Sequence, residues 1–193
     1  IVASIHTYTR PASADPGWTV GGALGSSEIR DGLLRHVGER GDWQWRVTLN
    51  SRRDDWLENQ RDDARDHILD TRAEWRPNNR DEVTVQIGGA LGEWDNSSVN
   101  FPFSELQTTD FSSGYAQAGW RRTLSADREW SLLLSHTKTR ADESFPLFFG
   151  VDNLNYWFSR SALEFSSQAR PFESLRTVWT VEARLDRAWS ASL

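Results

Sequence analysis

Apolar and polar residues alternate along the segment DWQWRVTLNS, residues 42–51. Trp43, Trp45, Val47 and Leu49 occupy every second position, and polar side chains occupy the positions between them. This period of two predicts a β-strand with two unlike faces. The apolar face of such a strand meets a protein core in a water-soluble sheet, whereas it meets lipid in an outer-membrane barrel. The other strands are needed to distinguish these two environments.

The same alternation recurs along the chain, while helical periodicity is weak throughout. In ILDTRAEW, Leu69, Ala73 and Trp75 share one face, and charged residues occupy the other. The segments EVTVQIGGAL, WSLLLSHT and RTVWTVEARL alternate in a similar way. We therefore predict an all-β fold, an antiparallel meander of about nine strands. The expected strands cover residues 17–26, 28–38, 42–53, 63–76, 82–93, 111–124, 128–141, 153–170 and 174–189.

The connections between these strands alternate between short turns and long loops. The short turns are residues 39–42, 77–81, 125–129 and 171–174. The long loops are residues 52–63, 94–110 and 141–153. The first hairpin breaks the rule, because a short SSE connection stands where a long loop is expected. Since consecutive strands run in opposite directions, all the other short turns fall at one end of the sheet, as they do in outer-membrane barrels.

The tryptophans support the same interpretation. Trp43, Trp75, Trp120 and Trp130 each lie within about five residues of a short turn, and they fall on the apolar face by parity. An aromatic girdle at one membrane interface would have this arrangement. We therefore expect the meander to be part of a transmembrane β-barrel with a polar lumen. The convex, lipid-facing side should carry Trp45, Val47, Leu69, Val85, Leu132 and Val181, and the concave side Arg46, Asp70, Arg72, Gln86, Glu182 and Arg184.

Composition excludes several other classes of protein. The 193 residues contain no apolar run of about 18 residues, which excludes a transmembrane helix. The net charge is −6 and no basic stripe is visible, so a nucleic-acid partner is not expected. Cysteine is absent, which excludes disulfides and thiolate metal sites.

Side chains that could carry catalysis or bind metal are not grouped in the sequence. The four histidines, His6, His36, His67 and His136, show no metal-binding spacing. Ser135 and His136 are adjacent, so they point to opposite faces of a strand and cannot form a nucleophile–base pair. We therefore expect no catalytic residues, no metal and no cofactor, and the protein is not expected to be an enzyme.

The segment SIHTYTRPASADPGWTVGGALGS, residues 4–26, resembles the junction between plug and barrel in TonB-dependent outer-membrane receptors. Ile5, Thr9 and Arg10 match the last plug strand of that family, and Gly25 and Ser26 match the end of the first barrel strand. His6, Thr7 and Tyr8 depart from the family pattern of Asn and Ile. By this resemblance, residues 1–10 are the last strand of a plug domain, residues 11–16 a linker, and residues 17–193 the N-terminal portion of the barrel.

The resemblance implies a transport function. Family members close a barrel of about 22 strands around a plug, so the sequence is expected to be one part of a receptor in the outer membrane of a Gram-negative cell. Such a receptor takes up a ferric siderophore, cobalamin or a similar large chelate, and it is driven by TonB through a segment N-terminal to this sequence. We expect lipid of the outer membrane to surround the receptor. The loop aromatics predicted to contact the ligand are Trp56, Trp94, Phe101, Phe103, Phe148 and Phe149.

Two other functions remain open from the sequence. One is a soluble all-β module that displays tryptophans on a carbohydrate-binding face. The other is a porin-like passive channel without a plug, for which the resemblance of residues 4–10 would be accidental.

Overall fold

A computed structural model describes residues 15–26, 28–55, 60–61, 63–98, 107–147 and 150–191. Within these residues the fold is all-β. The strands are β1 (Gly17–Leu24), β2 (Arg30–Arg40), β3 (Trp43–Asp55), β4 (Gln60–Arg61), β5 (Asp63–Trp75), β6 (Asp81–Ser98), β7 (Gln107–Ser125), β8 (Arg128–Leu147), β9 (Gly150–Phe172) and β10 (Leu175–Ser190).

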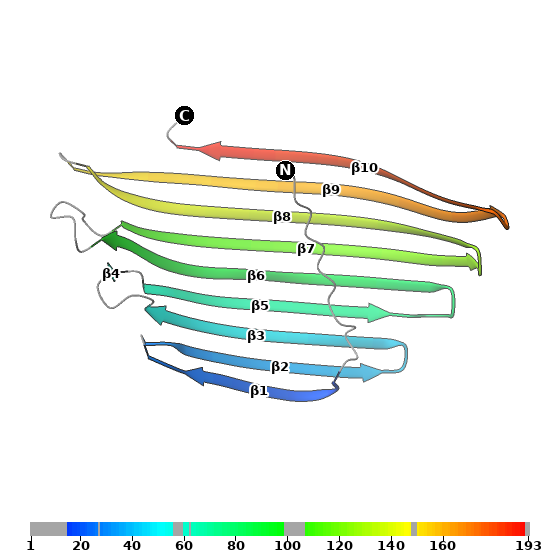
Figure 1. Ribbon diagram of the computed structural model, residues 1–193, viewed down its shortest axis with the longest axis horizontal. Helices are drawn as coiled ribbons and strands as arrows, with labels where there is room; N and C mark the ends of the chain where they lie inside the picture. Colours follow the sequence, from blue (N-terminus) through cyan, green and yellow to red (C-terminus); the bar gives the residue numbers. More distant parts are fainter. Residues whose placement is uncertain are drawn as a thin grey trace.

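The long strands form one antiparallel meander. Their order in the sheet is β1-β2-β3-β5-β6-β7-β8-β9-β10, and the two-residue β4 pairs with β6 beside this path. Figure 1 shows the strands side by side in chain order, with the turns after β2, β5, β7 and β9 at one end, which we call the short-turn end. We call the opposite end the loop end. The predicted meander and the placement of its short turns are therefore confirmed.

The sheet is open in the part of the chain that the structure describes. β1 and β10 are its edges, and neither pairs with the other. The structure thus supports the expectation of an antiparallel meander, but it does not contain a closed barrel.

Several strands are longer at the loop end than the alternation predicted. β6 continues to Ser98 and β7 begins at Gln107, so the predicted loop 94–110 is partly strand. β8 continues to Leu147 and β9 begins at Gly150, which replaces most of the predicted loop 141–153 with a hairpin. These extensions are rich in polar residues. Backbone pairing continues along them without alternating hydrophobicity, so the sequence pattern does not reveal them.

β2 shows how the neighbouring strands set the orientation of a strand whose own pattern is weak. Leu33 and Leu34 are adjacent and point to opposite faces. The pairing of Leu34 with Leu49 of β3 puts Leu34 on the same side as Val47. Val37 points to the other side, where it is only 2% exposed.

No second layer packs on this sheet among the described residues. Only Val37, Glu74, Thr109 and Ala141 are buried there, so the sheet has almost no conventional core. A soluble sheet covers its apolar face with another element. Here that face is open.

Candidate functional site

The strand register divides the side chains into two faces. Paired residues of neighbouring strands point to the same side of a sheet. Following the pairs from Val47 across β1 to β10 defines the apolar face, whose large aliphatic members include Val20, Leu34, Val47, Leu49, Leu69, Val85, Ile87, Leu91, Leu132, Leu134, Leu163, Val181 and Leu185. The polar face carries Arg46, Asp70, Arg72, Glu74, Gln86, Tyr115, Arg160, Glu164, Glu182, Arg184 and Asp186. The two residue sets predicted to share a face therefore do so.

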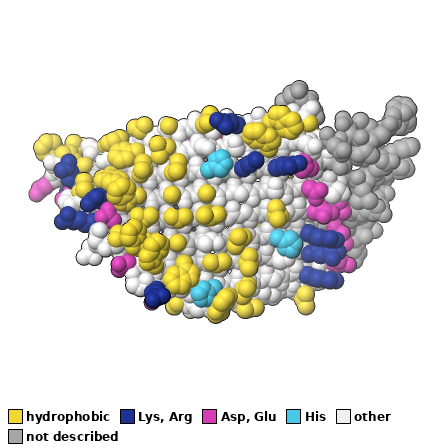
Figure 2. Space-filling view, turned by 180° about the vertical axis from the view of Figure 1, so that it is seen from behind, with side chains coloured by type: hydrophobic (Ala, Val, Ile, Leu, Met, Phe, Trp, Pro, Cys, Tyr) yellow, Lys and Arg dark blue, Asp and Glu magenta, His cyan; other side chains and the backbone are white. Residues whose placement is uncertain are grey.

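The apolar face exposes a broad band of hydrophobic side chains. Ile87 and Leu134 are each 55% exposed, and Leu91 is 62% exposed. Figure 2 shows this face, with hydrophobic side chains across its middle and charged side chains gathered toward its ends. A continuous apolar surface of this extent on a soluble protein indicates an interaction surface.

The dimensions of the band can be followed on β8. From Trp130, near the short-turn end, to Lys138, the first cation beyond the leucines, the strand advances about 27 Å at roughly 3.4 Å per residue. At a strand tilt of about 40°, this corresponds to roughly 20 Å along a barrel axis. The value is close to the apolar band of about 25 Å in outer-membrane barrels.

Aromatic rings gather on the apolar face at the short-turn end. Trp43 stacks on Trp75 with ring centroids 5.5 Å apart, and Trp120 meets Trp130 edge-on at 4.6 Å. The predicted placement of these four tryptophans on one face near the short turns is therefore confirmed. The set continues along β9 and β10, where Phe165 lies 6.1 Å from Trp130 and 5.2 Å from Trp179.

The polar edge of Trp120 points toward the turn that precedes β6. Trp120 Nε1 donates a hydrogen bond to Asp81 Oδ1 at 3.0 Å, and Asn78 Nδ2 donates to Asp81 Oδ2 at 3.0 Å. The bonds from Asn78 and Trp120 lower the pKa of the Asp81 carboxyl. An indole with its ring among apolar neighbours and its N–H at the wet end is typical of a membrane interface.

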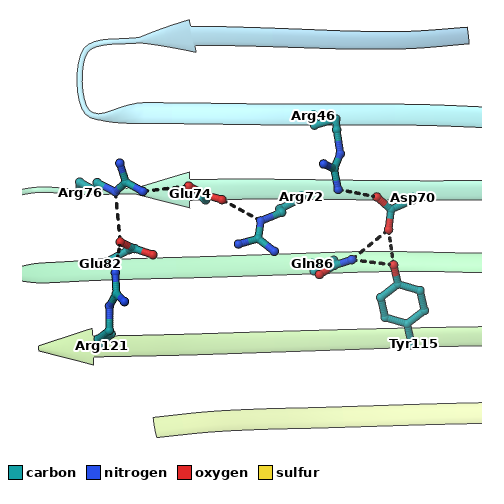
Figure 3. A network of polar contacts seen from close by, with 9 residues as sticks. All are labelled: Arg46, Asp70, Arg72, Glu74, Arg76, Glu82, Gln86, Tyr115 and Arg121. Atoms are coloured by element: carbon teal, nitrogen blue, oxygen red, sulfur yellow. Dashed lines mark hydrogen bonds and ion pairs between the residues drawn. The ribbon is translucent and has the colours of Figure 1, made fainter. Parts of the chain in front are cut away.

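The polar face carries a hydrogen-bonded cluster at the middle of β3, β5, β6 and β7 (Figure 3). Asp70 accepts from Gln86 Nε2 at 3.0 Å and from the Tyr115 hydroxyl, and Arg46 lies 3.5 Å from its other oxygen. Gln86 Nε2 also lies 3.0 Å from the Tyr115 oxygen. Residues from four consecutive strands of the meander are thus joined around one carboxylate.

A second group on the same face runs toward the short-turn end, as Figure 3 also shows. Glu74 accepts from Arg72 Nε at 2.8 Å and from Arg76 Nη2 at 3.2 Å. Glu82 accepts from Arg76 Nε at 3.2 Å and from Arg121 Nη2 at 2.7 Å. Charges alternate along this chain of contacts, so each carboxylate has two cationic neighbours.

In a soluble protein the apolar face of a sheet is buried and the polar face is exposed, whereas here the polar face is the more buried of the two. The Glu74 side chain is 2% exposed and that of Arg46 13%, while Leu69 on the apolar face is 44% exposed. Side chains crowd together on the inner side of a curved sheet and spread apart on its outer side. This difference therefore indicates that the polar face is the concave one.

Two glycines of β6 make room for aromatic side chains on the polar face. A Cβ at Gly88 would lie 2.6 Å from the Tyr115 ring and 2.7 Å from the Leu69 carbonyl oxygen. A Cβ at Gly92 would meet the Phe111 ring. Gly88 and Gly92 thus have a packing role in β6.

The predicted ligand-binding aromatics are described only in part. Trp94 was expected in a loop, but it lies in β6 on the polar face, with its ring centroid 4.8 Å from that of Phe111. Its strand position follows from the extension of β6 beyond the alternating segment. The other five predicted residues lie outside the described part of the chain: Trp56, Phe101, Phe103, Phe148 and Phe149.

The three described histidines lie apart on the apolar face. His36 packs between Trp18 and Trp45, at centroid distances of 4.4 and 6.4 Å. His136 Nδ1 lies 2.8 Å from the Ser161 hydroxyl of β9, a contact that the sequence did not reveal because it depends on register.

Within the described ranges, no group of three His, Asp or Glu side chains is arranged to hold a metal ion. The same ranges contain no helix that is long and apolar enough to cross a membrane.

Sequence reasoning also missed Tyr115, Glu74 and Arg121 as members of the polar clusters. The alternation assigns Glu74 to the polar face, but only the strand register identifies Arg72, Arg76 and their partners.

No protein-family model, curated protein or solved structure matches the chain.

Proposed function

We propose that the chain forms part of the wall of an outer-membrane β-barrel, with its apolar face against lipid and its polar face toward the interior. The observation that carries this proposal is the inverted burial: exposed leucines and valines on one face, and buried, hydrogen-bonded charges on the other. Lipid covers the outer side of such a barrel, while water and polar groups occupy the inner side.

The function supported best within this class is TonB-dependent uptake of a ferric siderophore or a similar large chelate. The support is the resemblance of residues 4–26 to the plug–barrel junction of TonB-dependent receptors, together with the tryptophan girdle at the short-turn end. In this function the polar face would line the space around a plug. The clusters around Asp70 and Glu74 would then provide fixed charges and hydrogen-bonding groups toward the interior.

The wall proposal can be tested by spin labelling, because the chain has no native cysteine. Single cysteines at Leu132, Leu133, Leu134 and Ser135 of β8 would carry the label in lipid bilayers. Oxygen, which concentrates in lipid, should reach positions 132 and 134, while a water-soluble nickel chelate should reach 133 and 135. Leu133 is informative because it is as apolar as its neighbours but belongs to the polar face.

Two results would contradict this arrangement. Equal oxygen accessibility at all four positions would remove the lipid-facing side. A chain that folds in water without detergent and shields positions 132 and 134 from both reagents would favour a soluble module.

The transport proposal needs a separate experiment on the receptor that contains this chain. Uptake of iron-55 bound to hydroxamate and catecholate siderophores, and of labelled cobalamin, would be compared in cells with and without TonB. Loss of uptake of one of these probes without TonB is the expected result. Uptake that continues without TonB would support a passive channel, and no uptake of any probe would reject this substrate class.

A further inference from the structure

Lys138, Ser159 and Arg187 form a row across β8, β9 and β10 on the apolar face, which we call the cationic row. The register pairs Lys138 with Ser159 and Ser159 with Arg187. With neighbouring strands about 4.8 Å apart, the two cations stand on backbone positions roughly 10 Å from each other. The small Ser159 side chain leaves the space between them open.

The two cations of the row have no acidic partner among the described residues. Lys138 Nζ lies 5.6 Å above the Trp157 ring, which is a cation–π contact and leaves its hydrogen-bond donors available. Two other cations of the apolar face at this end are in ion pairs: Arg140 contacts Asp142 at 3.0 Å, and Arg53 contacts Glu28 at 2.9 Å. Arg30 and Arg65 stand in one cross-strand row with Arg53, and this row also contains the acidic residues Glu93 and Asp110. The row that joins Lys138, Ser159 and Arg187 contains no acidic residue from β7 to β10, so its positive charge is not balanced within the row.

The position of the row marks the limit of the apolar band at the loop end. The next row on the apolar face, two positions toward the middle of each strand, consists of His136, Ser161 and Leu185. The row after it contains Leu134 and Leu163. On the other side of the row, Trp157 and Trp189 border a pocket of about 370 Å³ that Lys138 and Arg140 also line. Cationic, hydroxyl and indole side chains therefore lie together at the loop end of the aliphatic band.

We propose that the cationic row binds the phosphate headgroup of an anionic membrane lipid. The long side chains of Lys138 and Arg187 start from backbone positions about 10 Å apart and can converge on one phosphate group, and the Ser159 hydroxyl between them can donate to a phosphate oxygen. The acyl chains of the lipid lie along Leu134, Leu163 and Leu185, which continue from the row into the apolar band. Trp157 and Trp189 border the headgroup at the interface, as tryptophan does in membrane proteins.

This inference rests on the proposed function, because a lipid reaches the row only if the apolar face lies in a bilayer. Free phosphate could bind the two cations but would make no contact with Leu134, Leu163 and Leu185. These aliphatic residues therefore favour a lipid over the free ion. The binding contribution is expected to be electrostatic and therefore to weaken as salt is raised.

The test uses the whole chain in phosphatidylcholine bilayers that contain a trace of spin-labelled lipid. Electron spin resonance separates lipid held at the protein surface from free lipid, and it gives the association of labelled phosphatidic acid relative to labelled phosphatidylcholine. The test variant is Lys138→Gln with Arg187→Gln. The matched control is Arg30→Gln with Arg65→Gln, which removes two cations from the same face and end of the sheet. Lys138→Arg with Arg187→Lys keeps the charge.

The wild-type chain should prefer phosphatidic acid, and the test variant should lose about fivefold of this preference for each cation removed. The control and the charge-preserving variant should retain it. The inference is overturned if the wild type and the test variant have equal selectivity, or if the control loses as much selectivity as the test variant. It is also overturned if excess inorganic phosphate, but not matched chloride, displaces the labelled phosphatidic acid. These results would leave the wall proposal intact, whereas protein that holds no lipid of either kind at its surface would reject the wall proposal itself.

Discussion

At the scale of single residues, Asp70 is the centre of the polar cluster. Its carboxylate accepts from Gln86 and Tyr115 and neutralises Arg46, which is mostly shielded from solvent. Replacing Asp70 with Ala removes one carboxylate acceptor from all three groups, which should lower the free energy of unfolding by about 1–3 kcal/mol. Urea unfolding in detergent micelles, followed by circular dichroism, measures this change.

The control for this prediction is Glu39→Ala, because Glu39 is exposed on the same face at the short-turn end of β2. Its stability should differ little from that of the wild type. A loss at Glu39 as large as that at Asp70 would mean that the cluster has no special role in stability.

Gly88 permits a second residue-scale prediction. Gly88→Ala would bring a methyl group to 2.6 Å from the Tyr115 ring and 2.7 Å from the Leu69 carbonyl oxygen. The backbone oxygen cannot turn aside, so we expect a loss of about 1–3 kcal/mol in the free energy of unfolding. Gly32→Ala on β2 is the matched comparison, since a Cβ there meets nothing within 4 Å. Equal effects of the two substitutions in the same unfolding assay would show that overpacking at Gly88 is not the cause.

At the scale of the strand, adjacent positions should respond in opposite ways to one substitution. Val85→Arg places a cation on the apolar face of β6, and it should cost about 2–4 kcal/mol of folding free energy in lipid if the position lies near the bilayer midplane. Thr84→Arg puts the same side chain on the polar face beside Glu74. Folding equilibria in phospholipid vesicles should therefore show a large loss for the first variant and a small change for the second. Similar losses would indicate that both faces meet the same medium.

The strands also explain how much of the fold and the site could be predicted. In strands with clear alternation, a period of two gives the face of a residue without knowledge of the neighbouring strands, and the assignments of Val47, Leu69 and Arg72 needed nothing more. The pattern contains no information on register. Tyr115 and Asp70 are 45 residues apart, and their contact depends on how β5, β6 and β7 align. Polar strand ends such as those of β8 and β9 were missed because they lack alternation.

At the scale of the whole molecule, the direction of the edge strands limits how a barrel can close. Eight antiparallel pairings separate β1 from β10, so these two edges run in the same direction. Joining them directly would create a parallel seam. In a barrel that is antiparallel throughout, at least one additional strand must stand between them.

The six aromatic residues predicted to contact the ligand give a prediction for a complete receptor. Aromatic side chains can cover the flat, partly apolar surface of a metal chelate with little loss of rotamer freedom. Replacing all six predicted aromatics with Ala should therefore weaken binding of a ferric siderophore in a titration of purified receptor: Trp56, Trp94, Phe101, Phe103, Phe148 and Phe149. Unchanged affinity, with normal receptor levels in the membrane, would assign the ligand to the plug and to other loops.

The open edge itself leads to the last prediction. β10 pairs with β9 on one side only, whereas β7 pairs with both β6 and β8. Alternate amides of β10 therefore have no strand partner among the described residues, and unpaired backbone groups are costly away from water. In detergent micelles, hydrogen exchange followed by mass spectrometry should be faster for residues 175–190 than for residues 107–125. If both segments are equally protected, the edge is covered. Protection of β10 that decreases on dilution would identify a second copy as the cover, and protection independent of concentration would point to a segment of the same chain.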